Sequence, residues 1–366
     1  MALDIGIIGL PNVGKSTLFN ALAGTSVPCS NYPFCTVEAN VGVVPVQDER
    51  LAKLGALLHP EKVTPAGIRF VDIAGLVRGA SRGEGLGNQF LASIRDVSAV
   101  AHVVRCFEAP SVSHVEQGGL DPERDIDIVR TELILADLET AERNLEKRRK
   151  DAGRGDKEAQ PFAAALERAV AALSAGTELR KAALDHETLE HLEPYRFITA
   201  KDVLYVANVG EADIGVRERG WVGRISAAVK EPEWKVVPIA AETESELVKL
   251  PDAERAEMAS GLGLTETGLD RLVATARRLL GLVTFFTIKG PEVRAWTIPA
   301  GTGLAKAAGK IHTDMESGFI RGDVVSFADL LDGGSMHGAR EKGHVRTEGR
   351  DYAVREGDIV LVHFHA

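Results

Sequence analysis

The chain has 366 residues, 45% hydrophobic and 26% charged, a balance typical of a globular protein of two or three domains. Its formal net charge of −10 excludes a protein whose entire surface is basic and binds nucleic acid. We therefore expect no DNA partner, and any RNA contact needs a local basic patch. Cys29, Cys35 and Cys106 form no Cys-x-x-Cys pair, which argues against a disulfide scaffold or a zinc site. No signal peptide and no apolar run long enough to span a bilayer are visible, so we expect a cytoplasmic protein without a membrane partner.

The first predicted element is a short apolar strand at residues 5–8, followed by the glycine-rich sequence GLPNVGKS at residues 9–16. This sequence matches the phosphate-binding loop pattern, and the helical pattern of residues 16–22 follows it as the motif requires. Backbone N–H groups and the helix N-terminus would hold the phosphates, and Lys15 would reach the outer ones. Ser16 offers a hydroxyl to Mg²⁺. The loop predicts a nucleoside triphosphate site, without the identity of the base.

The next buried strand ends in the sequence DIAG, which begins with Asp72 and ends with Gly75. Asp72 would hold Mg²⁺ through water, and the Gly75 N–H would approach the γ-phosphate. Thr36 stands where a first switch segment would lie and is a second hydroxyl candidate for Mg²⁺; a plain loop threonine is the alternative. Leu76 occupies the position where Ras-type enzymes have the glutamine that orients the attacking water. Another group must orient the water, or intrinsic hydrolysis will be slow.

Apolar strands that alternate with helices over residues 1–127 predict an α/β P-loop domain, a mostly parallel sheet with helices on both faces. Apolar residues spaced by three and four then predict two antiparallel helices, which we interpret as an inserted helical hairpin, or short coiled coil, at residues 128–198. The run from Arg143 to Lys150 is strongly basic. It is either a solvated helix tip or a patch for RNA phosphates or an acidic partner.

The α/β pattern resumes at residue 199 and continues to residue 281, and its strand at residues 203–207 ends in the sequence NVGE. GTPases read guanine at this point with Asn-Lys-x-Asp. Here Val209 replaces the lysine, and Glu211 is one methylene too long for the same two-bond grip. Because a lost buried hydrogen bond costs roughly 1–3 kcal/mol per group, a strong guanine preference is not expected. Asn208 can still contact the purine N7 or exocyclic amine, so adenine becomes plausible.

The last part of the chain, residues 282–366, contains short strand-like segments separated by turns with glycine and proline. It predicts a small α+β module.

Together these residues resemble the Obg-like ATPase (YchF) family of translation-factor-class P-loop proteins, over essentially the whole chain. The motifs that carry the resemblance are LPNVGKST at 10–17, NYPFCT at 31–36, DIAGLV at 72–77 with the glycine-rich stretch 79–87, NVGE at 208–211, KIHTD at 310–314 and GFIR at 318–321. The resemblance implies an OBG-type G domain, hydrolysis of ATP in preference to GTP, and a C-terminal TGS domain with a β-grasp fold. It also implies binding to the ribosome or its large subunit, through rRNA or a ribosomal protein.

Carried over by position, the resemblance implies roles for individual residues. The nucleotide-binding set would be Asn12, Val13, Gly14, Lys15, Ser16, Thr17, Gly75, Asn208, Val209 and Glu211. The Mg²⁺ set would be Ser16, Thr36 and Asp72. Asn12 would also be a K⁺ ligand, so that the ion supplies the charge of an arginine finger. Lys15 and His114 would be catalytic, His114 orienting the water in place of the missing glutamine.

Three functions remain open from the sequence. The chain is expected to be a nucleotide-dependent switch on the ribosome, with slow intrinsic turnover. The first alternative is a binding scaffold in stress or redox control that nucleotide merely stabilises. The second is a GTPase of ribosome assembly in which Glu211 replaces the aspartate.

Overall fold

The computed structural model describes residues 3–25, 40–73, 86–108, 119–215 and 218–365. The chain divides into two compact units, residues 1–24 with 70–275, and residues 25–69 with 276–366. The grouping of residues 25–69 with the C-terminal part was not indicated by the sequence pattern. The domain boundaries expected at residues 127, 198 and 281 remain predictions.

The first unit contains a parallel sheet of strands in the order β4-β1-β5-β6-β7. Its strands are β1 (Asp4–Ile8), the end of β4 (Gly67–Asp72), β5 (Ala99–Cys106), β6 (Asp202–Val209) and β7 (Val236–Ile239). All eight residues of β5 are buried, as expected of a central strand covered on both faces. The register pairs Ile8 with His102 and Asn208 with Ile239, so the carboxyl ends of the strands meet at one edge.

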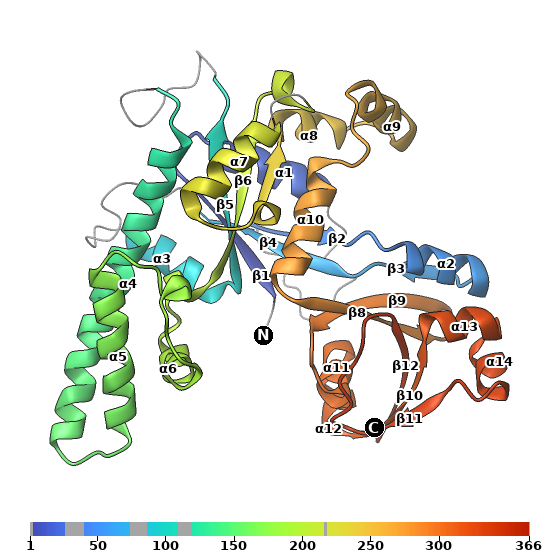
Figure 1. Cartoon of the computed structure of the whole chain (residues 1–366). Helices are drawn as coiled ribbons and strands as arrows, with labels where there is room; N and C mark the ends of the chain where they lie inside the picture. The colour runs from blue at the N-terminus through green and yellow to red at the C-terminus, as the bar shows by residue number, and fades with distance from the viewer. Residues whose placement is uncertain (1–2, 26–39, 74–85, 109–118, 216–217, 366) are drawn as a thin grey trace. The chain divides into compact units, whose positions relative to one another are not determined.

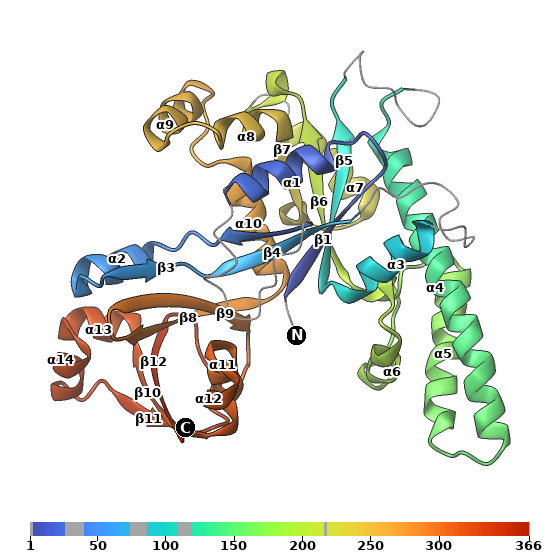
Figure 2. The same ribbon diagram turned by 180° about the vertical axis from the view of Figure 1, so that it is seen from behind.

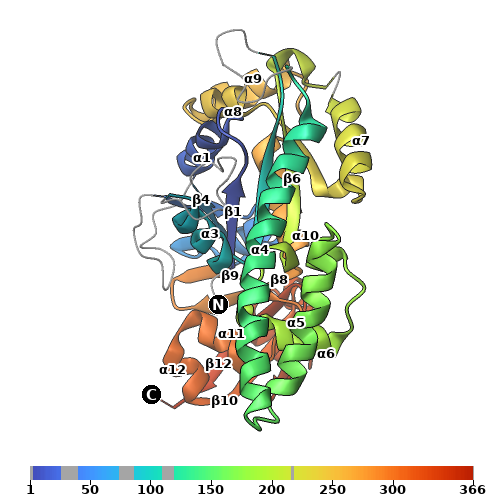
Figure 3. The ribbon, with the colours of Figure 1, turned by 90° about the vertical axis from the view of Figure 1, so that its left-hand side faces the viewer.

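Helices cover both faces of this sheet. Figure 3 shows α1 (Lys15–Gly24) on one side and α7 (Glu218–Val229) on the other, and α8 (Ala241–Leu247) lies beside α1 in Figure 2. The remaining helices of the unit are α3 (Leu86–Asp96), α4 (Pro122–Gly153), α5 (Ala159–Ser174), α6 (His186–Leu192), α9 (Asp252–Gly261) and the start of α10 (Gly268–Leu279). Its short 3₁₀ turns are η3 (Leu179–Lys181), η4 (Glu193–Tyr195), η5 (Ile198–Ala200), η6 (Glu211–Asp213) and η7 (Glu233–Lys235). The predicted α/β architecture with helices on both faces is confirmed.

The predicted helical hairpin is formed by α4 and α5, which lie antiparallel and extend beyond the sheet of their own unit (Figure 1). Asp121 caps the N-terminus of α4 through the Arg124 N–H, and Pro122 occupies the first turn. The helices bury an apolar seam that includes Ile134, Ala141 and Leu166. The spacing of these residues in the sequence therefore identified the correct helix faces.

The second unit contains a mixed sheet in the order β11-β10-β12-β8-β9-β3. Its elements are β2 (Val41–Pro45), α2 (Glu49–Leu58), β3 (Lys62–Thr64), β8 (Leu282–Lys289), β9 (Glu292–Pro299), α11 (Leu304–Ile311), α12 (Thr313–Ser317), β10 (Phe319–Ser326), α13 (Phe327–Gly333), α14 (Met336–Glu341), β11 (Arg346–Glu348) and β12 (Asp358–Phe364). Strand β2 pairs with β4, whose first residues belong to this unit. The β8–β9 pair is antiparallel and the β12–β8 pair is parallel.

A core around Phe285, Trp296 and Leu304 packs α11 against this sheet. The C-terminal residues thus form a domain of helices and a mixed sheet with its own core, which agrees with the α+β module predicted. Among the described residues, none of the helices is both long and apolar enough to span a membrane.

Candidate functional site

The glycine-rich loop joins the end of β1 to the start of α1, at the carboxyl edge of the sheet. Three of its residues have positive φ angles: Gly9 at 151°, Asn12 at 62° and Gly14 at 94°. The side chains of Leu10 and Val13 are buried and fix the loop to the domain. The backbone therefore curls at the N-terminus of α1, where free N–H groups and the helix dipole favour an anion.

Lys15 is the first residue of α1 and is only 8% exposed. Its Nζ donates to the Leu10 carbonyl oxygen at 2.7 Å, across the loop. Burial lowers the pKa of this lysine to about 8, although the negative charge of Asp72 opposes the shift. A phosphate is a stronger acceptor than a carbonyl because it is charged, so the Lys15 ammonium is placed to exchange its loop contact for a phosphate oxygen.

Oxygen donors suitable for Mg²⁺ lie beside Lys15. Ser16 is exposed in the first turn of α1, and Asp72 ends β4, the strand next to β1. Burial raises the pKa of Asp72, and Lys15 partly offsets this effect. A hydroxyl and a carboxylate are the hard ligands that Mg²⁺ takes together with phosphate oxygens and water, so the donor set fits this ion.

Asn208 connects the phosphate loop to the end of β6, which is separated from β1 by β5 in the sheet. This residue lies near the end of β6 and is 4% exposed. Its Nδ2 donates to the Val13 carbonyl oxygen at 2.8 Å, and its Oδ1 accepts from the Ala241 N–H at 3.1 Å. A Cβ on Gly14 would lie 2.2 Å from this Nδ2, so only glycine permits the approach. Asn208 thus supports the loop by joining it to the end of β6 and the start of α8.

The neighbours of Asn208 in the NVGE sequence differ from one another in burial. Val209 is the last residue of β6 and its side chain is buried, so only its backbone could face a base. Glu211 begins the exposed turn η6. Thr36, Gly75 and His114 lie outside the described residues.

Two residues that support the site, Ala241 and Glu244, were not predicted from the sequence. Ala241 supplies the N–H that Asn208 accepts, from the first turn of α8. Glu244, one turn later, is buried and accepts from the Gly268 N–H at the start of α10. Burial raises the pKa of Glu244, and the Gly268 hydrogen bond opposes that shift. Their position directly after β7 could have indicated them, because the carboxyl end of β7 adjoins that of β6 and such strand ends form ligand sites.

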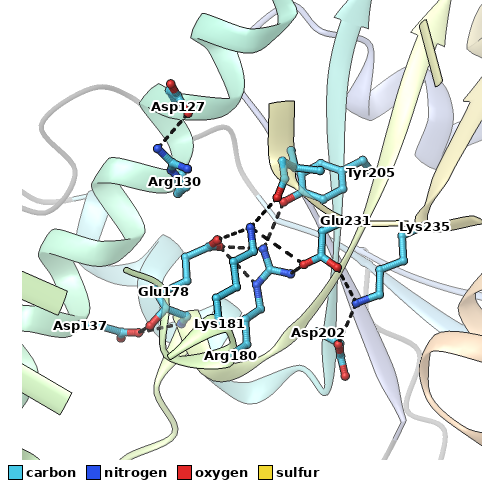
Figure 4. Close-up of polar contacts among 12 residues, drawn as sticks. Asp127, Arg130, Asp137, Glu178, Arg180, Lys181, Asp202, Tyr205, Glu231 and Lys235 are labelled. Carbon is cyan, nitrogen blue, oxygen red and sulfur yellow. Dashed lines mark hydrogen bonds and ion pairs between the residues drawn. The ribbon is translucent and has the colours of Figure 1, made fainter. Parts of the chain in front are cut away.

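A buried polar network lies where the chain leaves the hairpin (Figure 4). Arg180 donates to Glu231 at 2.6 Å, to Glu178 at 2.9 Å and to the Tyr205 hydroxyl at 3.2 Å. Burial alone would raise the pKa of Glu178, but Arg180 and Lys181 bring it below the usual value. Burial raises the pKa of Tyr205 to about 12. The network ties the exit of the hairpin to β6 and to the segment before β7.

Asp137 fixes the middle of α4 in the same unit. Its carboxylate is fully buried and accepts from the Thr199 N–H at 2.7 Å and the Thr199 hydroxyl at 2.8 Å. Arg95, near the end of α3, forms an ion pair with it at 3.3 Å. The hairpin is therefore anchored to the segments that flank β5 and β6.

A curled loop between a buried parallel strand and a helix, with lysine at the helix start and aspartate at the end of the neighbouring strand, defines a P-loop nucleotide-binding domain. Residues 4–142 match the family model described as 50S ribosome-binding GTPase. Residues 282–365 match the model YchF-GTPase_C, described as a protein of unknown function.

Curated relatives cover the full length of the chain. The chain is 45% identical to the ribosome-binding ATPase YchF of Haemophilus influenzae over 365 residues, 100% of both chains. It is 44% identical to the protein of the same name in Bacillus subtilis over 368 residues, again 100% of both. The solved structure of the Schizosaccharomyces pombe YchF GTPase is 34% identical, with a TM-score of 0.86 and coverage of 99% of this chain and 97% of that one. The chain belongs to the YchF family.

Proposed function

We propose that this chain is an ATPase that binds the ribosome in a nucleotide-dependent manner. The observation that carries the proposal is the phosphate loop, which is curled at the N-terminus of α1 and held by Asn208 against the strand ends that would face a base. The full-length relatives described as ribosome-binding ATPases support both the nucleotide and the partner. A cytoplasmic location follows from a ribosomal partner.

Each residue of the loop has a defined role in this proposal. The N–H groups of residues 12–17 bind the phosphates, and Lys15 neutralises the outer ones. Ser16, Thr36 and Asp72 would hold Mg²⁺, which supplies positive charge at the β- and γ-phosphates. The left-handed backbone of Asn12 places this residue at the exposed turn of the loop, where its side chain would bind K⁺.

The base preference follows from the NVGE sequence. Because the Val209 side chain is buried, no residue at that position covers a ring as the GTPase lysine does. Glu211 stands where those enzymes have an aspartate. We therefore assign adenine as the preferred base, contacted by the second N–H of Asn208 and by backbone groups at Val209 and Glu211.

Hydrolysis needs a group that orients water, since Leu76 cannot form the necessary hydrogen bond. We assign this role to His114, because a neutral imidazole nitrogen can accept a hydrogen bond or a proton from water. Gly75 would place its N–H on the γ-phosphate. With no glutamine at the site, the intrinsic rate is expected to be slow.

Calorimetry with ATP and GTP under identical Mg²⁺ and K⁺ conditions tests the proposal. ATP should bind at least tenfold more tightly than GTP. The second candidate is a GTPase, which the description of the S. pombe structure and the GTPase family model favour. A tenfold preference for GTP would select it and would reject adenine as the preferred base.

A further inference from the structure

A row of cations lies on the outer face of α4, near the tip of the hairpin. The residues are spaced by four, three and four positions, so they share one helix face. We call this row the tip stripe; its members are Arg143, Lys147 and Lys150 of α4 and Arg154, the C-cap residue directly after the helix. All four are exposed. At 1.5 Å per residue the stripe extends for roughly 16 Å along the helix axis.

The stripe is opposite to the side of α4 that packs on α5. Ile134, Ala141 and Leu145 form the buried side, and none of the stripe residues contributes to that core. The helix would bury the same seam with any polar residues on its outer face, so packing does not account for a row of cations. Residues 143–157 contain seven Lys and Arg against three acidic residues, in a chain whose net charge is −10.

Other cations of the tip contact partners within the hairpin, whereas most cations of the tip stripe form no ion pair among the described residues. Arg149 forms an ion pair with Glu167 at 2.7 Å, and Arg148 lies over the Phe162 ring at 4.8 Å. Within the stripe, Lys150 pairs with Glu146 at 2.6 Å. Among the residues that the structure describes, no ion pair involves Arg143, Lys147 or Arg154. These three charges are therefore available to an external anion.

The chemistry of the tip favours a phosphate backbone over a protein surface. Protein interfaces generally bury an apolar centre. Within the described part of the first unit, the large hydrophobic side chains that are exposed are Leu135 and Leu189, and neither lies in residues 143–157. A linear row of cations one helical turn apart, without an apolar centre, instead suits a chain of phosphates, which arginine and lysine bind through charge.

We propose that the tip stripe binds the RNA phosphate backbone, and specifically that it is a contact of this chain with ribosomal RNA. The assignment of rRNA rests on the proposed ribosome function. Asp137 holds the middle of α4 and the Arg180 network holds the segment after α5 (Figure 4), so the stripe has a fixed place relative to the sheet of its own unit. The helix that carries it is continuous from Pro122 to Gly153.

The test compares two triple variants with equal loss of charge. The tip variant is R143Q/K147Q/R154Q. The control is R219Q/K230Q/K249Q, which removes three exposed cations of the same unit outside the hairpin. Binding of each protein to purified ribosomal subunits and to deproteinised rRNA is measured from 50 to 300 mM KCl, with circular dichroism and ATP turnover without ribosomes as checks of folding.

We expect the tip variant to bind both probes at least about tenfold more weakly than wild type at 100 mM KCl. The slope of log K against log [KCl] should become smaller in magnitude by roughly 2 to 3, because each lost phosphate contact removes about 0.7–0.9 from it. The control should keep the wild-type affinity and slope. If wild type and tip variant bind equally, the proposal that the tip stripe contacts rRNA is wrong, while the proposed ribosome function stands. Loss on subunits but not on rRNA would assign the stripe to an acidic protein and overturn the RNA proposal. If the wild type binds no subunits, the ribosome function itself fails, and the rRNA assignment with it.

Discussion

The side-chain amide of Asn208 donates to the carbonyl oxygen of Val13 at 2.8 Å, although the two residues are 195 positions apart in the chain. This hydrogen bond holds the phosphate loop against the end of β6. The Ala241 N–H completes the connection by donating to the same side chain. A single buried amide therefore joins the phosphate loop, the end of β6 and the start of α8, and in the proposed function it would couple recognition of the base to that of the phosphates.

Replacement of Asn208 by alanine should weaken ATP binding by at least tenfold. The change removes both hydrogen bonds and leaves the Val13 carbonyl and the Ala241 N–H buried without this partner, at a cost of roughly 1–3 kcal/mol per group. Calorimetry with ATP measures the effect. N208D, which keeps the acceptor and loses the donor, should lie between wild type and N208A; wild-type affinity in N208A would show that the coupling has no role in binding.

The double variant V209K/E211D should shift the preference toward GTP by about tenfold or more. It restores the Asn-Lys-x-Asp sequence, in which aspartate accepts two N–H groups of guanine and the lysine stem covers the ring. Each single variant should have a smaller effect, since the two groups act together. Competition between ATP and GTP for the same fluorescent nucleotide gives the ratio. An unchanged ratio would locate base selection outside residues 208–211.

ATP affinity should fall as the pH rises above 8, because the pKa of Lys15 lies at about 8 and the neutral amine binds phosphate weakly. The decline approaches tenfold per pH unit at its limit. Titrations at pH 7, 8 and 9 test this, with Lys15→Met as the control whose weak binding should not vary with pH. A wild-type affinity that stays constant to pH 9 would contradict the depressed pKa.

The same pKa predicts how stability depends on pH. The unfolded chain retains the Lys15 proton up to a pH of about 10.5, whereas the folded protein releases it from about pH 8. Since the unfolded state binds more protons in this window, the contribution of Lys15 to stability rises with pH there. Without nucleotide, Lys15→Met should therefore be more stable than wild type at pH 7, and the difference should shrink by pH 9. Urea unfolding at the two pH values gives the difference; a constant value would refute the linkage.

Arg180→Met should lower the free energy of unfolding by up to about 3–5 kcal/mol, because Glu178 and Glu231 would lose the more buried of the two cations that they share and keep the more exposed Lys181. Urea unfolding measures the loss. The triple variant R180M/E178Q/E231Q removes the carboxylate charges too and should recover much of the stability. If the triple variant is less stable than R180M, packing and not charge explains the network.

The parts of the fold that depend on local pattern could be predicted from the sequence. The seam of the hairpin repeats every three to four residues, and the loop at residues 9–16 carries its own signature. The contacts that hold the phosphate loop and anchor the hairpin join distant positions: Asn208 to Val13, Arg180 to Glu231 and Asp137 to Thr199. No periodicity specifies which strand end or turn an asparagine or aspartate will meet, so these pairs needed the structure.

Sedimentation of the chain with purified ribosomes, loaded either with a non-hydrolysable ATP analogue or with ADP, tests the central claim most directly. The claim predicts that the fraction bound differs severalfold between the two nucleotides, and that Lys15→Met binds alike under both conditions. Equal binding of the wild type in the two nucleotide states, each confirmed to be occupied, would contradict a nucleotide-dependent switch on the ribosome.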